Sequence, residues 1–135
     1  MKEPVVQKYD FGCAIACLAF VLDITYDDSA KIVGAKQAGS NRFYVKDLLK
    51  TLNDNRLSYE SKHIKPKIRS RIYEEGVIVL IRRSRHYPSG HYLIRHKSVW
   101  MDPWINLPYD KDIINAKAGY RKRLPGNPMY ALLPK

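Results

Sequence analysis

The sequence predicts an α+β fold, with helices in the first half of the chain and a mainly antiparallel sheet in the second. Residues 14–22 carry no charge and are apolar on every side, so a helix there would be buried on most faces. Residues 45–52 place valine and leucine at helical spacing. Residues 77–81 form a continuous apolar, β-branched run, which is typical of a strand buried on both faces. With 135 residues, 45% of them hydrophobic, residues 1–135 are expected to form a single domain around one core.

Weaker patterns predict the remaining elements. Expected helices run from Asp27 to about Ala35, from Tyr44 to Leu52, from Ile68 to Glu75 and from Asp110 to Ala118. Expected strands cover Leu57–Ile64, His91–Arg95, Val99–Met101 and Met129–Leu133, and expected loops include Gly119 and Leu124–Pro128. This order, helices before strands, is the basis of the α+β prediction.

Cys13 lies at the predicted start of the buried first helix. Gly12 permits a sharp turn before it, and Asp10 is a candidate cap for the first helical turn. A helix N-terminus favours a thiolate over a thiol, so this position suits a nucleophile. Cysteine is also a common packing residue, and that interpretation stays open for Cys13 and is favoured for Cys17.

His91 and Asp102 stand at opposite ends of a predicted hairpin, HYLIRHKSVWMD. If the turn is centred between His96 and Lys97, the numbers of facing residues sum to about 193, so His91 faces Asp102 on one side of the sheet. A nucleophile, an imidazole base and an orienting carboxylate form the triad Cys13, His91, Asp102. Gln7 is then a candidate donor to a developing oxyanion, together with the Cys13 backbone amide.

Each of these residues also has an ordinary structural interpretation. His91 could be a surface histidine, as His63 and His86 in basic runs and His96 at the predicted turn are expected to be. Asp102 followed by proline could end a strand, and Gln7 could belong to a loop. We predict a site because these residues occur together in one chain.

The stretches that carry these residues resemble the double-glycine leader peptidases, papain-like cysteine peptidases that occur as bacteriocin-processing domains and as free-standing relatives. Gln7 with DFGCAIACLA over 10–19 is similar to the nucleophile motif, GHYLI over 90–94 to the histidine strand, and VWMDPW over 99–104 to the Asp-Pro motif. The family usually has glycine where this chain has Ala14.

The resemblance implies a papain-like fold and a thiol hydrolase, most simply a cysteine peptidase, acting on a peptide or protein substrate. It implies Gln7 as the oxyanion-hole residue, Cys13 as nucleophile, His91 as base and Asp102 as its orienter. No metal or organic cofactor is expected. Because no transporter segment follows, we expect a stand-alone peptidase, a toxin-like effector or a phage-type protein.

The net charge of +11, from 24 Lys and Arg against 13 Asp and Glu, leaves a second function class open. Basic runs at 62–71, 82–86 and 121–123 are either a solvated face or a surface for an acidic protein, such as an inhibitor, or for nucleic acid. In that alternative the protein is a binding module whose thiol is incidental. A zinc site from Cys13, Cys17 and histidines is less favoured, because this cysteine spacing is not that of a usual zinc finger.

The sequence contains neither a signal-peptide core nor an apolar run long enough for a membrane span. Two cysteines four residues apart do not make a disulfide framework. We therefore expect a cytoplasmic location, or delivery of the protein as an effector.

Overall fold

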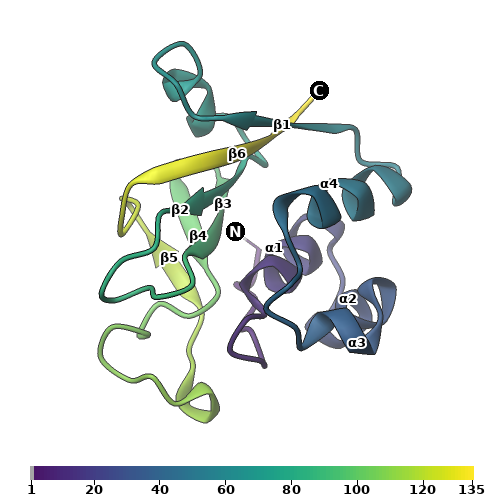
Figure 1. Ribbon diagram of the computed structural model, residues 1–135, viewed down its shortest axis with the longest axis vertical. Helices are drawn as coiled ribbons and strands as arrows, with labels where there is room; N and C mark the ends of the chain where they lie inside the picture. Colours follow the sequence, from purple (N-terminus) through teal and green to yellow (C-terminus); the bar gives the residue numbers. More distant parts are fainter. Residues whose placement is uncertain (1) are drawn as a thin grey trace.

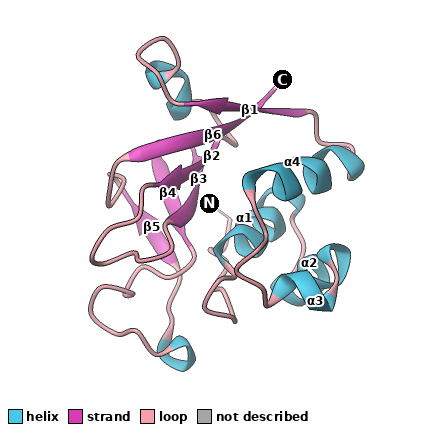
Figure 2. Ribbon diagram, viewed as in Figure 1, coloured by secondary structure: helices cyan, strands magenta, loops and turns pink. Residues whose placement is uncertain are grey.

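Helices and sheet occupy two sides of the molecule in the computed structural model, which describes residues 2–135 (Figure 1). The helices are α1 (Cys13–Leu22), α2 (Tyr26–Val33), α3 (Ala35–Ala38) and α4 (Val45–Asp54), with short 3-10 helices η1 (Arg69–Tyr73) and η2 (Ile113–Asn115). The strands are β1 (Tyr59–His63), β2 (Ile78–Ile81), β3 (His91–His96), β4 (Val99–Asp102), β5 (Gly119–Arg121) and β6 (Pro128–Pro134). Figure 2 shows the same separation by element type.

The six strands form one sheet in the order β1-β6-β2-β3-β4-β5, and every neighbouring pair is antiparallel. The last strand of the chain, β6, lies between β1 and β2, so the C-terminal segment belongs to the interior of the sheet. The predicted α+β class, with helices first and an antiparallel sheet after them, is confirmed.

The two faces of the sheet bury separate apolar clusters. On one face α1 packs against residues such as Ile78, Tyr92 and Ile94. On the other face Leu93 and Trp100 pack with residues of η1 and of the loops that follow β2 and β4. Alternate residues of the β3–β4 hairpin therefore point into different clusters, as the two-residue period of a strand requires.

The first helix is buried as predicted, but its N-terminus is capped differently. Residues 14–20 of α1 are all buried. The N-cap residue is Gly12, and no side chain caps the helix, so the proposed capping by Asp10 is wrong. In α2 the helix begins one residue earlier than predicted, because Thr25 Oγ1 accepts a hydrogen bond from the Asp28 amide.

The β3–β4 hairpin is shifted from the predicted register. Ile94 faces Met101 and His96 faces Val99, so facing numbers sum to about 195 instead of 193 and the turn is Lys97–Ser98. Asp102 consequently lies diagonally across from His91. A shift by two residues preserves the side of the strand, since side chains alternate with period two, so the predicted shared face is retained.

His96 was expected at the turn and on the surface, and this is wrong. It is the last residue of β3 and is buried, with its ring edge-on to Phe20. Its Nδ1 lies 2.9 Å from a carboxylate oxygen of Glu75. The two-residue shift of the turn moves His96 from the loop into the strand.

Two predictions for the last third of the chain also differ from the structure. Residues 110–118 contain only the 3-10 turn η2, because Ile114 is 86% exposed and no apolar stripe faces the core. Gly119, expected in a loop, begins β5, whose three residues pair with β4. None of the helices within residues 2–135 has the length and apolar character needed to cross a membrane.

Candidate active site

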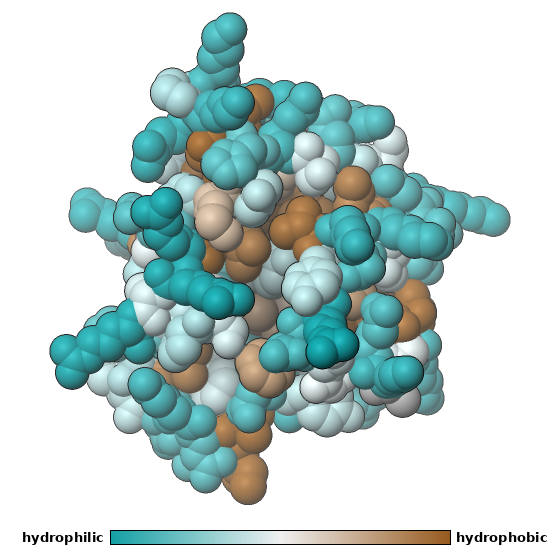
Figure 3. All heavy atoms as spheres, in the orientation of Figure 1, coloured by the Kyte–Doolittle hydropathy of each residue, from teal (hydrophilic) through white to brown (hydrophobic). Residues whose placement is uncertain are grey.

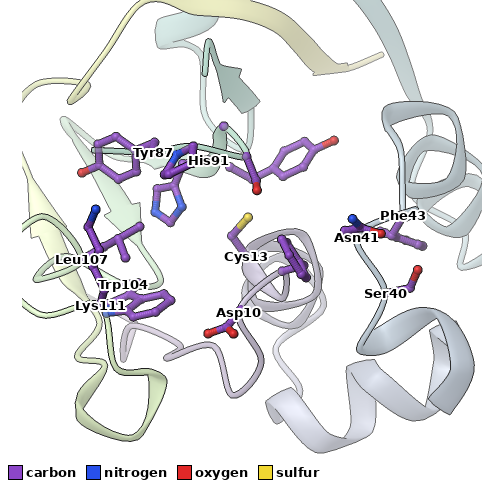
Figure 4. A pocket seen from close by; sticks show the side chains of 15 residues that line it. Asp10, Cys13, Ser40, Asn41, Phe43, Tyr87, His91, Trp104, Leu107 and Lys111 are labelled. Atoms are coloured by element: carbon purple, nitrogen blue, oxygen red, sulfur yellow. The ribbon is translucent and has the colours of Figure 1, made fainter. Parts of the chain in front are cut away.

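Cys13 is the first residue of α1 and opens onto a cleft between the helices and the sheet (Figure 4). Gly12 precedes it in close contact with the buried Tyr26, and a Cβ at residue 12 would overlap the Tyr26 hydroxyl. Glycine therefore lets the chain pass close to α2 before it turns into the helix. The sulfur of Cys13 points into the cleft, toward the side on which the His91 ring lies.

His91 is the first residue of β3 and is only 2% exposed. Like Cys13, His91 follows a glycine that a larger residue could not replace without strain. Gly90 has φ +73, and a Cβ there would lie 2.9 Å from the Ile81 carbonyl oxygen. The ring of Tyr87 stacks on the imidazole with a centroid separation of 5.0 Å. The turn before β3 thus fixes both the position and the plane of the imidazole.

Asp102, at the end of β4, is fully buried and holds the far side of this imidazole. His91 Nε2–H donates to Asp102 Oδ1 at 2.6 Å, and the Trp104 backbone amide donates to the same oxygen at 3.0 Å. This arrangement leaves His91 Nδ1 as the ring nitrogen available to Cys13.

The other carboxylate oxygen of Asp102 faces Arg121 from the neighbouring strand β5. Arg121 Nε lies 3.0 Å from Asp102 Oδ2. The two groups form an ion pair, but the contact does not have hydrogen-bond geometry. The Arg121 side chain is 25% exposed, so its charge is shielded only partly by solvent. The charged groups therefore continue from His91 through Asp102 to Arg121.

These contacts favour a protonated imidazole and an ionised carboxylate. Burial lowers the pKa of His91, but hydrogen bonds to Asp102 and Cys13 and the charges of both raise it to about 9. Burial raises the pKa of Asp102, yet its contacts with His91, the Trp104 amide and Arg121 outweigh burial and lower it. The electrostatics of the site therefore favour an imidazolium at His91 paired with an ionised Asp102.

Arg121 is a site residue that sequence analysis missed. In the sequence it belongs to the basic run 121–123, for which a solvated face or a partner-binding surface is expected. Its position beside Asp102 depends on the pairing of Trp100 with Arg121 across β4 and β5. The alternation in Gly119-Tyr120-Arg121 was the one available signal, and three residues are too few for a period-two pattern to be read.

Gln7 is the one predicted site residue whose side chain is engaged elsewhere. It is 2% exposed, and its Nε2 donates to the carbonyl oxygens of Tyr9 at 2.9 Å and Asp10 at 3.2 Å. Both amide hydrogens are therefore used to hold the loop that leads to Cys13. An oxyanion role for Gln7 stays a prediction and requires this amide to reorient.

The cleft around Cys13 has a volume of about 260 Å³, and each of its walls combines apolar with polar side chains. One wall comes from Ser40, Asn41 and Phe43, and the other from Trp104, Leu107 and Lys111, with residues 87–92 between them. In the space-filling view of Figure 3, apolar side chains surround a hollow near the middle of the face, and hydrophilic side chains border them. The space is suited to a chain that passes over Cys13.

Cys17, one turn along α1 from Cys13, is fully buried, as predicted. Burial raises the pKa of the Cys17 thiol well above its ordinary value. The two cysteines thus differ in environment, one at a cleft and one in the core. Within residues 2–135, no group of three His, Cys, Asp or Glu side chains is arranged to hold a metal ion.

No protein-family model, curated protein or solved structure matches this chain.

Proposed function

We propose that the protein is a thiol hydrolase, specifically a cysteine peptidase with a papain-like arrangement of its site. The observation that carries the proposal is that Cys13 begins a buried helix beside His91, and Asp102 holds the opposite nitrogen of the same imidazole at 2.6 Å. Nucleophile, base and orienting group come from three separate elements, α1, β3 and β4. Such an arrangement is the signature of covalent catalysis at a carbonyl.

In the proposed reaction the Cys13 thiolate attacks the carbonyl carbon of a peptide bond. The tetrahedral intermediate collapses when His91 donates its proton to the departing amine, which leaves a thioester on Cys13. His91, now neutral, removes a proton from water, and the resulting hydroxide attacks the thioester. The products are a carboxylic acid and an amine, and Cys13 and His91 return to their starting protonation states.

The developing oxyanion is placed beside the N-terminus of α1. The first N–H groups of a helix have no partner within it, and they carry the positive end of the helix dipole. The Cys13 backbone amide is one of these groups, and it is fixed relative to the sulfur by the helix itself. Stabilisation by backbone amides placed in advance is the main way in which such sites lower the barrier.

The substrate that this cleft favours is an unfolded or flexible peptide segment. Phe11, Phe43, Tyr92 and Trp104 provide apolar contact around Cys13, and Ser89 and Gly90 also line the cleft. Lys111 is the only Lys or Arg among the lining residues, so the cleft does not share the high positive charge of the whole chain.

The test is covalent labelling and peptide cleavage with matched cysteine variants. Wild-type protein is expected to react with a peptidyl vinyl sulfone at Cys13 and to cleave members of a peptide library, both identified by mass spectrometry. Cys13→Ala should abolish labelling and cleavage, whereas Cys17→Ala should retain both. Labelling that persists in Cys13→Ala, or the absence of any modification of Cys13, would overturn the proposal.

A further inference from the structure

A second hollow lies on the sheet face that α1 does not cover, between η1 and the segment that joins β5 to β6. Its volume is about 370 Å³. Three cationic side chains line it, from Arg69, Lys122 and Arg123, and no carboxylate of residues 2–135 is among the lining groups. None of its lining residues belongs to the Cys13 cleft, so this is a separate site.

The positive charge at this hollow is not neutralised by the carboxylates close to it in sequence. Glu60 and Glu74 are both directed to Arg71, at 3.8 and 3.9 Å. The backbone of a further arginine, Arg82, lies next to the hollow. Its amide donates to the carbonyl oxygen of Asn127 at 2.8 Å, and Asn127 lines the hollow. The site therefore attracts an anion.

An aromatic wall accompanies these cations. Tyr73 lines the hollow and is 56% exposed, and its ring lies edge-on to the buried Trp100 at 6.2 Å. The Arg95 guanidinium lies 5.2 Å from the centroid of each ring and holds the two aromatics in place. A fixed, exposed tyrosine beside cations provides a flat surface on which a ring can stack.

From this combination we infer that the hollow binds single-stranded nucleic acid, with phosphates against Arg69, Lys122 and Arg123 and a base against Tyr73. Proteins that bind single strands without strong sequence preference combine a positively charged groove with aromatic side chains on which bases stack. A duplex keeps its base faces covered, so it could use the cations but not Tyr73. An acidic protein segment would likewise use the charges and gain little from the aromatic ring.

The experiment is fluorescence anisotropy of the full chain with a labelled 12-nucleotide single strand, measured over a salt series. The triple variant Arg69→Ala, Lys122→Ala, Arg123→Ala should bind more weakly, and the slope of log affinity against log salt should decrease by about 2, since each lost phosphate contact removes ~0.7. The matched control is Lys31→Ala, Lys36→Ala, Lys117→Ala, which removes the same charge from exposed positions outside the hollow. If both triple variants change the slope equally, diffuse charge explains the binding and the site is refuted.

Tyr73 separates stacking from simple charge attraction. Tyr73→Ala should weaken single-strand binding by about 5- to 150-fold, the range for loss of one stacked base, and Tyr73→Phe should restore it. Affinity for a duplex and for polyglutamate should be the same in Tyr73→Ala as in the wild type. Absence of binding at low salt, or preferential binding of polyglutamate, would overturn the inference in favour of a solvated or protein-binding face. The result is independent of peptidase activity, because Cys13→Ala should bind the strand like the wild type.

Discussion

The two sides of the Cys13 cleft, a helix wall formed by residues 7–22 and a sheet wall formed by β3, β4 and β5, position the residues of the proposed site in different ways. On the helix wall one continuous stretch, 7–22, supplies Cys13, the loop before it and the helix that carries it. On the sheet wall His91, Asp102 and Arg121 come from β3, β4 and β5 and meet only because those strands pair. Close packing positions the thiol, whereas buried charges position the imidazole. The helix wall should therefore be most sensitive to added volume, and the sheet wall to altered charge.

The largest effect is expected on the sheet wall, from Asp102→Asn. Without the carboxylate charge the pKa of His91 should fall from about 9, and the imidazole loses the group that fixes its tautomer. Turnover should decrease by about 10²- to 10⁴-fold. NMR titration of the His91 ring and peptide cleavage rates measure the two effects.

The control for that variant is Asp28→Asn, the same chemical change on an exposed first turn of α2. It should leave both the titration of His91 and the cleavage rate unchanged. An Asp102→Asn protein with an unaltered His91 titration would show that the sheet wall does not work through charge.

On the helix wall the corresponding change is one of volume, Gly12→Ala. The added Cβ overlaps the hydroxyl of the buried Tyr26, so the Tyr26 ring or the start of α1 must shift, and we expect the displacement to include Cys13. We expect cleavage to slow by about 10²-fold, the order of loss that a displacement of ~1 Å produces in a positioned group. Adding Tyr26→Phe removes the overlapping atom and should recover most of the rate. Failure of the double variant to recover would mean that packing against Tyr26 is not what positions the thiol.

Gln7→Ala tests how the loop before Cys13 is held. Loss of the two partly buried hydrogen bonds to Tyr9 and Asp10 should lower the free energy of unfolding by about 1–3 kcal/mol, measured by urea denaturation. Cleavage should also slow, by roughly tenfold, because the loop relaxes. A pure oxyanion donor would behave differently: it would lower the acylation rate by ~10²–10³ and spare stability.

The smallest expected effect is that of Arg121→Gln. Loss of its charge should raise the pKa of Asp102, so that activity is lost at a higher pH on the acidic side than in wild type. The direction of this change follows because the Asp102 carboxylate acts on His91 only in its ionised form, which predominates only above the pKa of Asp102. At neutral pH the rate should decrease by no more than about tenfold, since the partly exposed guanidinium is screened. Arg121→Lys should restore the wild-type position of the acidic limb of the pH–activity profile. An identical profile in the wild type, Arg121→Gln and Arg121→Lys would exclude a positioning role for Arg121.

This difference between the walls also explains what could be predicted from sequence. The buried helix and the position of Cys13 at its start follow from a local pattern within 7–22, and the structure has both; the role of Cys13 as nucleophile stays a prediction. His91 and Asp102 were placed on the same face despite a register error of two residues, because an even shift keeps the parity of a strand. Arg121 could not be found in this way, since β5 has three residues and its pairing is decided by tertiary contacts. The helix expected over 110–118 failed for a related reason: its isoleucines are not buried by any neighbouring element.

The central claim, that Cys13 is the reactive thiol and His91 its partner, is tested most directly by site-resolved alkylation of Cys13 with and without His91. Iodoacetamide modification would be followed site by site by mass spectrometry from pH 5 to pH 10, with Cys17 as the internal reference. We expect Cys13 to be modified much faster than the buried Cys17, whose pKa burial raises. A change in the rate at Cys13 is expected near pH 9, where His91 loses its proton, and His91→Ala should slow the modification of Cys13 and remove this change. Modification of Cys13 that is no faster than that of Cys17, or that is unaffected by His91→Ala, would contradict the claim.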